Sequence, residues 1–148
     1  MILYLDTSAL VKLYIKEQHR ELVSAANEEA EFVTTSTVAY AEARAALARQ
    51  LRTGNLDDHQ RQQEVANLDA DWLAFLHLEV SNTLTGHAGE LAQAHTLRGF
   101  DAIHLASALH FAKEFDDLRF LAFDKRLNDA AREASLTTYG DSTIPGLE

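Results

Sequence analysis

Cysteine is absent from this chain, and its absence excludes disulfide bonds, a thiol nucleophile and a metal site built on thiolates. Long apolar runs are absent too, because nowhere do about eighteen apolar residues follow one another, as a membrane-spanning helix requires. The apolar N-terminus is interrupted at Asp6 and has no basic segment before it, so it does not have the pattern of a secretory signal peptide. We therefore expect a cytoplasmic protein that crosses no membrane.

Motifs for nucleotide binding are also missing. The chain has no Gly-x-x-x-x-Gly-Lys-Ser/Thr segment, which argues against a P-loop enzyme, and no glycine-rich turn after Leu5, which argues against a dinucleotide-binding fold. A phosphotransfer receiver domain needs an aspartate after its third strand, where this chain has the segment 80–82, Val-Ser-Asn. Three common classes of α/β protein are thus disfavoured.

The formal net charge of −10 argues at first sight against nucleic-acid binding, because affinity for a polyphosphate depends largely on lysine and arginine. Basic residues nevertheless stand close to acids that are candidates for a site. These are Lys12 and Lys16 after Asp6, Arg44 after Glu42, Arg98 before Asp101, and Lys125 and Arg126 after Asp124. Ordinary solvated helix faces would explain the same basic residues, so both interpretations stay open.

Strand-like apolar runs alternate with helix-like segments along the chain. Strands are predicted at residues 2–5, 32–35, 76–80, 120–123 and 137–139, and helices at 8–16, 20–29, 37–52, 57–75, 83–97, 100–114 and 125–134. This alternation predicts right-handed crossovers onto a mainly parallel sheet with helices on both faces. We therefore expect an α/β fold, a three-layer α/β/α sandwich that forms one domain over residues 1–148, with an irregular tail at 140–146.

Two aspartates each follow an apolar strand and precede a helix. Asp6 follows residues 2–5, and Asp124 follows residues 120–123. Parallel strands carry both residues to the same edge of the sheet, where open α/β proteins bind their ligands. Helix capping is the alternative explanation for each, because aspartate is a common N-cap residue.

Two further acids lie on helices beside small apolar residues. The neighbours of Glu42 one turn away are Val38, Ala39, Ala45 and Ala46. Burying an unpaired carboxylate is costly, so Glu42 should meet a cation, either a metal ion or an arginine such as Arg49. Asp101 opens its helix, where the dipole alone would stabilise it. His104, one turn later, is a candidate for substrate contact, and a purely structural role is the alternative.

Oxygen ligands dominate this candidate set. Asn128 lies four residues after Asp124, where its amide oxygen can support a metal ion or its water. The chain has no His-x-His and no His-Glu-x-x-His pattern, so a hard cation, Mg²⁺ or Mn²⁺, is favoured over zinc. Converging carboxylates repel one another without a cation, which makes the set most sensible as a metal site that binds phosphates.

The four acids in their sequence context resemble the PIN-domain ribonucleases, in particular the VapC-type toxins of toxin–antitoxin pairs. The segments that carry the resemblance are Asp6-Thr7-Ser8, Glu42, Asp101 in Phe-Asp-Ala-Ile-His-Leu-Ala, and Asp124 in Phe-Leu-Ala-Phe-Asp-Lys-Arg-Leu. The resemblance covers nearly the whole chain and implies that the four acids bind metal and are catalytic. Many relatives carry a hydroxyl residue at the position of Ala122, which leaves Asp124 without that support here.

The resemblance implies an endoribonuclease that uses one or two Mg²⁺ or Mn²⁺ ions to activate a water molecule against a phosphodiester. The substrate would be RNA, such as tRNA. The expected substrate contacts are Thr7, Ser8, Lys12, Arg44, Arg98 and His104. The expected partners are a cognate antitoxin and a second copy of the chain in a homodimer. A catalytically inactive metal-binding scaffold or RNA-binding module is the alternative, which the missing hydroxyl at Ala122 favours and the complete set of acids opposes.

Overall fold

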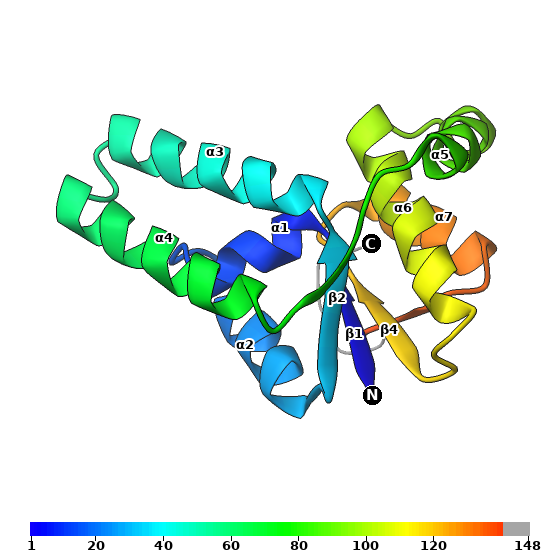
Figure 1. Cartoon of the computed structure of the whole chain (residues 1–148), viewed down its shortest axis with the longest axis horizontal. Helices are drawn as coiled ribbons and strands as arrows, with labels where there is room; N and C mark the ends of the chain where they lie inside the picture. Colours follow the sequence, from blue (N-terminus) through cyan, green and yellow to red (C-terminus); the bar gives the residue numbers. More distant parts are fainter. Residues whose placement is uncertain (141–148) are drawn as a thin grey trace.

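The computed structural model describes residues 1–140, and the predicted tail lies almost wholly outside them (Figure 1). The strands are β1 (Ile2–Leu5), β2 (Phe32–Ser36), β3 (Leu76–Leu78), β4 (Leu118–Leu121) and β5 (Thr137–Thr138). The helices are α1 (Thr7–Leu10), the 3₁₀ helix η1 (Val11–Leu13), α2 (Arg20–Glu29), α3 (Val38–Arg52), α4 (Asp58–Trp72), α5 (Asn82–His95), α6 (Gly99–Ala112) and α7 (Lys125–Glu133).

The strands form one sheet in the order β3-β2-β1-β4-β5, and every neighbouring pair is parallel. The central strand β1 is buried along its whole length. This is the reason for its uninterrupted apolar sequence, because a strand covered on both faces has no solvent-facing side. The predicted α/β fold with a parallel sheet is confirmed.

The two faces of β1 pack against different helices. Ile2 and Tyr4 belong to a core with residues of α5, α6 and α7, whereas Leu3 and Leu5 belong to a core with α1, α2, α3 and α4. This gives the three layers of the predicted sandwich. Figure 1 shows α3 and α4 side by side as a hairpin that reaches away from the sheet. None of the described helices is both long and apolar enough to cross a membrane.

The predicted helix 8–16 is wrong in length. Helix α1 covers only Thr7–Leu10 and tightens into η1, in which the amide of Tyr14 donates to the carbonyl of Val11. The tighter turn brings Tyr14 and Ile15 into the core, where both are buried. Packing of these two side chains explains why the longer helix does not form.

Strand β4 is displaced from the predicted range 120–123 by two residues. Leu118 is buried and pairs with Ile2, so the strand begins earlier. After Leu121 the chain leaves the sheet, and side chains form hydrogen bonds with the backbone groups that no longer pair with a neighbouring strand. The carbonyl of Ala122 accepts from Asn128, and the amide of Phe123 donates to Ser8. Other predicted boundaries also differ: β3 ends at Leu78 and α4 ends at Trp72.

Candidate active site

Asp6 lies directly after β1, where it is the N-cap of α1. Its Oδ1 accepts hydrogen bonds from the amide of Ala9 at 2.9 Å and from Ser8 Oγ at 2.7 Å. The residue is only 3% exposed, and within residues 1–140 no lysine or arginine forms an ion pair with it. Burial raises its pKa to about 6, although the charge of His104 and the hydrogen bonds from Ser8 and Ala9 lower it; the charge of Asp101 adds a smaller rise. A buried carboxylate that pairs with no lysine or arginine of the described residues thus lies at this edge of the sheet.

Glu42 faces the same edge from α3. Its Oε1 accepts a hydrogen bond from Thr7 Oγ1 and lies 3.2 Å from Nε2 of His104 on α6. Burial opposes ionisation, but the hydrogen bonds from His104 and Thr7 outweigh it, so the pKa of Glu42 is lowered. Arg49 was the alternative partner, but within the described residues Glu42 makes its contacts with the histidine and the threonine instead.

Asp101 lies in the first turn of α6, as predicted. Arg98 Nε donates to its Oδ2 at 3.3 Å, and the arginine side chain is 83% exposed. The charge of Asp101 makes a small contribution to the raised pKa of Asp6. Arg98 therefore lies at the solvent rim of the acidic edge.

Asp124 is the N-cap of α7, and its Oδ1 accepts from the amide of Leu127 at 2.9 Å. The loop before it is tied to Asp6 through Ser8, whose Oγ accepts from the amide of Phe123 at 3.1 Å and donates to Asp6. Nδ2 of the buried Asn128 donates to the carbonyl of Ala122 at 2.9 Å. These contacts support the loop that carries Asp124 without the hydroxyl that is missing at Ala122.

The candidate basic residues are placed differently from one another. Lys12 forms an ion pair with Glu17 at 2.8 Å and lies 4.6 Å above the ring of Phe123, next to Asp124. Arg44 is not brought to the acids. Its Nη1 donates to Tyr40 on the side of α3 that faces α4, nearly opposite to Glu42. Lys12 and Arg98 therefore border the acidic edge, and Arg44 does not.

His104, expected to contact substrate, is 2% exposed and lies inside the site. Its Nδ1 is 2.9 Å from Tyr4 Oη. Sequence reasoning missed Tyr4, although its signal was present: a hydroxyl within the apolar run of a central strand needs a buried hydrogen-bond partner.

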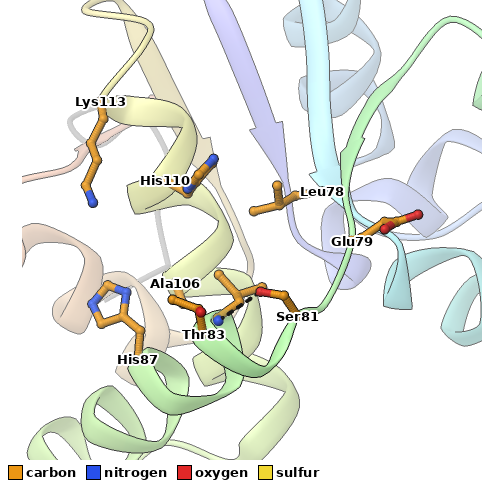
Figure 2. Close-up of a pocket in the computed structure, with 9 residues that line it drawn as sticks. Leu78, Glu79, Ser81, Thr83, His87, Ala106, His110 and Lys113 are labelled. Carbon is orange, nitrogen blue, oxygen red and sulfur yellow. Dashed lines mark hydrogen bonds between the residues drawn. The ribbon is translucent and has the colours of Figure 1, made fainter.

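The structure thus brings Asp6, Glu42, Asp101 and Asp124 to one edge of the sheet. Within residues 1–140, however, no three histidine, aspartate or glutamate side chains are gathered closely enough to form a ready metal site. A separate cavity of about 280 Å³ lies between β3, α5 and α6 (Figure 2). Its lining includes His87, His110 and Lys113, and none of the four acids, so it is not part of this site.

Together, the fold and the site define an α/β protein with an acidic, hydroxyl-lined site at the carboxyl edge of a parallel sheet. The family profile described as "PIN domain" matches residues 3–133. The chain belongs to the PIN-domain family. This confirms the resemblance found in the sequence.

Three curated proteins of Mycobacterium tuberculosis are similar to this chain. Ribonuclease VapC45 (strain CDC 1551 / Oshkosh) and Ribonuclease VapC49 (strain ATCC 25618 / H37Rv) are each 38% identical over 133 residues, which cover 90% of this chain and 91% of the relative. Ribonuclease VapC47 (strain CDC 1551 / Oshkosh) is 34% identical over 147 residues, which cover 97% of this chain and 99% of the relative. The match to the family profile, over residues 3–133, includes the segments that carry the four acids.

Two solved structures share the fold. The crystal structure of FitAcB from Neisseria gonorrhoeae matches with a TM-score of 0.68 at 20% identity, covering 97% of this chain and 100% of that chain. The crystal structure of VapBC2 from Rickettsia felis, bound to a DNA fragment from its promoter, matches with a TM-score of 0.62 at 14% identity, covering 93% and 97%. At these identities the likeness concerns the arrangement of helices and strands.

Proposed function

We propose that the protein is a metal-dependent endoribonuclease and the toxin of a type II toxin–antitoxin pair. The observation that carries the proposal is the buried Asp6 at the ligand-binding edge of a PIN-domain sheet, where it forms an ion pair with no lysine or arginine of residues 1–140. The names of the VapC ribonucleases, similar over nine tenths of the chain, support the reaction type.

The donor chemistry of the site fits a hard divalent cation, Mg²⁺ or Mn²⁺. Asp6, Glu42, Asp101 and Asp124 are the residues that would hold one or two ions, with Asn128 in support. The buried carboxylate of Asp6 is destabilised while it is unpaired, and a cation would remove that cost. When bound, the metal supplies an activated water and stabilises the charge that develops on the phosphate.

Other residues would bind and orient the RNA. Thr7 and Ser8, expected from the sequence to contact the substrate, instead donate hydrogen bonds to Glu42 and Asp6. We therefore propose that these two hydroxyls orient the carboxylates, and that basic residues contact the RNA. Arg98 is exposed at the rim and can contact a phosphate of the substrate. Lys12 lies beside Phe123, where its charge is shared with Glu17. A positively charged rim would offset the negative net charge of the chain near the scissile bond.

The proposal also covers the protein's binding partners, its domain organisation and its location in the cell. We propose an antitoxin that covers the acidic site, and a homodimer as the state of the toxin. We also propose that residues 1–148 form a single domain and that the protein acts in the cytoplasm.

The test uses the purified protein, freed of any partner, with total RNA and defined tRNAs in Mg²⁺ or Mn²⁺. Parallel reactions contain EDTA, the variant Asp6→Asn, or the matched control Asp116→Asn. Asp116 is exposed and lies before β4, at the opposite edge of the sheet. We expect discrete RNA fragments from the wild type and from Asp116→Asn, and none in EDTA or from Asp6→Asn. Equal cleavage by both variants would refute the assignment.

A catalytically inactive scaffold or RNA-binding module is the second candidate. Ala122 favours it, because this position lacks a hydroxyl that could support Asp124. The same experiment separates the two functions. A protein that gains stability from Mn²⁺, binds RNA and releases no fragment would be the scaffold.

A further inference from the structure

The buried histidine of the site connects the central strand to an acid. His104 Nδ1 lies 2.9 Å from Tyr4 Oη, while its Nε2 lies 3.0 Å from Thr7 Oγ1 and 3.2 Å from Glu42 Oε1. Both Tyr4 and His104 are almost completely buried. The ring therefore has no path to RNA, and its contacts within the protein must account for its presence.

The direction of these hydrogen bonds follows from the groups involved. A carboxylate only accepts, so the His104 nitrogen that faces Glu42 must carry a proton. The phenol hydroxyl of Tyr4 lies within hydrogen-bond distance of Nδ1 and can donate to it. Tyr4 thereby selects the tautomer in which Nε2–H points at Glu42.

Both donors reach the same oxygen of Glu42. Thr7 Oγ1 and His104 Nε2 contact Oε1, and the contacts of Glu42 found within residues 1–140 leave Oε2 without a hydrogen bond. A glutamate side chain has several rotatable bonds, and fixing it on its own costs conformational entropy. Because Thr7 and His104 both hold Oε1, the carboxylate group of Glu42 is fixed, and the direction of its Oε2 is fixed with it.

We infer that Tyr4 and His104 are positioning residues that fix Glu42 through Oε1 and keep its Oε2 available to a divalent cation. The inference rests on the proposed function for the cation, and it assigns His104 a role that does not require contact with the substrate. Partners that orient a metal ligand typically change metal affinity by about tenfold to a hundredfold when they are removed.

The test compares Mn²⁺ affinity, measured by calorimetry, with kcat and KM for RNA in four variants. Tyr4→Phe removes only the hydroxyl, His104→Leu removes both ring nitrogens, and His104→Gln keeps an amide N–H that can point at Glu42. Phe111→Leu is the matched control, because Phe111 packs against the ring of Tyr4 without touching the polar contacts.

We expect Tyr4→Phe to weaken Mn²⁺ binding by about tenfold and His104→Leu by up to about a hundredfold, with kcat reduced and KM for RNA unchanged. His104→Gln should recover part of the loss, and Phe111→Leu should bind Mn²⁺ like the wild type. Urea denaturation of each variant separates changes in affinity from changes in stability.

Wild-type Mn²⁺ affinity in both Tyr4→Phe and His104→Leu would overturn the inference, whether or not these variants also lose stability as Phe111→Leu does. The failure of the proposed function looks different. In that case the wild type binds Mn²⁺ and cleaves no RNA, while the comparison of affinities still decides the role of Tyr4 and His104.

Discussion

Replacing Asp6 by asparagine should stabilise the metal-free protein at neutral pH. The side chain is 3% exposed, and its pKa rises from the usual 3.8 to about 6, chiefly because of burial. At about 1.36 kcal/mol per pKa unit, the ionised carboxylate costs the folded state about 3 kcal/mol. Asparagine removes the charge and keeps an oxygen that can accept from Ala9 and Ser8, so the variant should recover most of this cost.

The sign of the pH dependence follows from the raised pKa. Protonated Asp6 favours the folded state below pH 3.8, and this advantage is lost as the pH rises through about 6. The stability gap between Asp6→Asn and the wild type should therefore be under about 1 kcal/mol at pH 4 and about 3 kcal/mol at pH 7.5. Taking the difference between the two proteins cancels the titration of groups that they share.

The assay is urea denaturation in EDTA at both pH values, followed by the same measurement at pH 7.5 with Mn²⁺. Mn²⁺ should stabilise the wild type and have little effect on Asp6→Asn, because a ligand that binds only the folded state raises its stability. A wild type that is more stable than Asp6→Asn at pH 7.5 in EDTA would refute this reasoning, since it would mean that the carboxylate already has a favourable partner.

Three further predictions concern other parts of the site. Glu42→Gln should lose RNA cleavage. Because the pKa of Glu42 is lowered, its contribution to stability should be present above its usual 4.5 and disappear as the pH falls, which urea denaturation from pH 7 to 3 would reveal. Asn128→Ala should destabilise the fold by about 1–3 kcal/mol, because it leaves the carbonyl of Ala122 without its donor, and equal denaturation midpoints would contradict this. Arg98→Ala should raise KM for RNA and weaken its salt dependence while thermal stability stays unchanged, and an unaltered KM would remove Arg98 from the interface.

Asp6 and Asp124, the aspartates that follow β1 and β4, could be predicted from the sequence because the pattern that identifies them lies within a few consecutive residues. An apolar run, an acid and a helix follow one another at Asp6, and the parallel sheet brings Asp124 to the same edge. The alternation of strands and helices is equally local, so the layers of the fold were predictable. Both aspartates cap a helix at the edge of the sheet, and this capping does not exclude the proposed role in metal binding.

The contacts inside the site could not be predicted, because they join residues far apart in the chain. His104 meets Glu42 and Tyr4 across separations of 62 and 100 residues, and the sequence around His104 does not encode these partners. Arg44 follows Glu42 by two residues, which suggested a role near that acid. Its side chain instead lies on the side of α3 that faces α4, where it contacts Tyr40. The shortened α1 and the displaced β4 likewise follow from packing and from side-chain contacts to the backbone, and not from local preference.

The most direct measurement is the rate at which one defined RNA is cleaved as a function of Mn²⁺ concentration. The wild type is compared with Asp101→Asn and Asp116→Asn, and circular dichroism verifies that each variant is folded. We expect saturable, Mn²⁺-dependent cleavage by the wild type and by Asp116→Asn, and almost none by Asp101→Asn. Normal turnover by a folded Asp101→Asn variant, or cleavage that is independent of Mn²⁺, would contradict the proposal that the acids at this edge form the catalytic site.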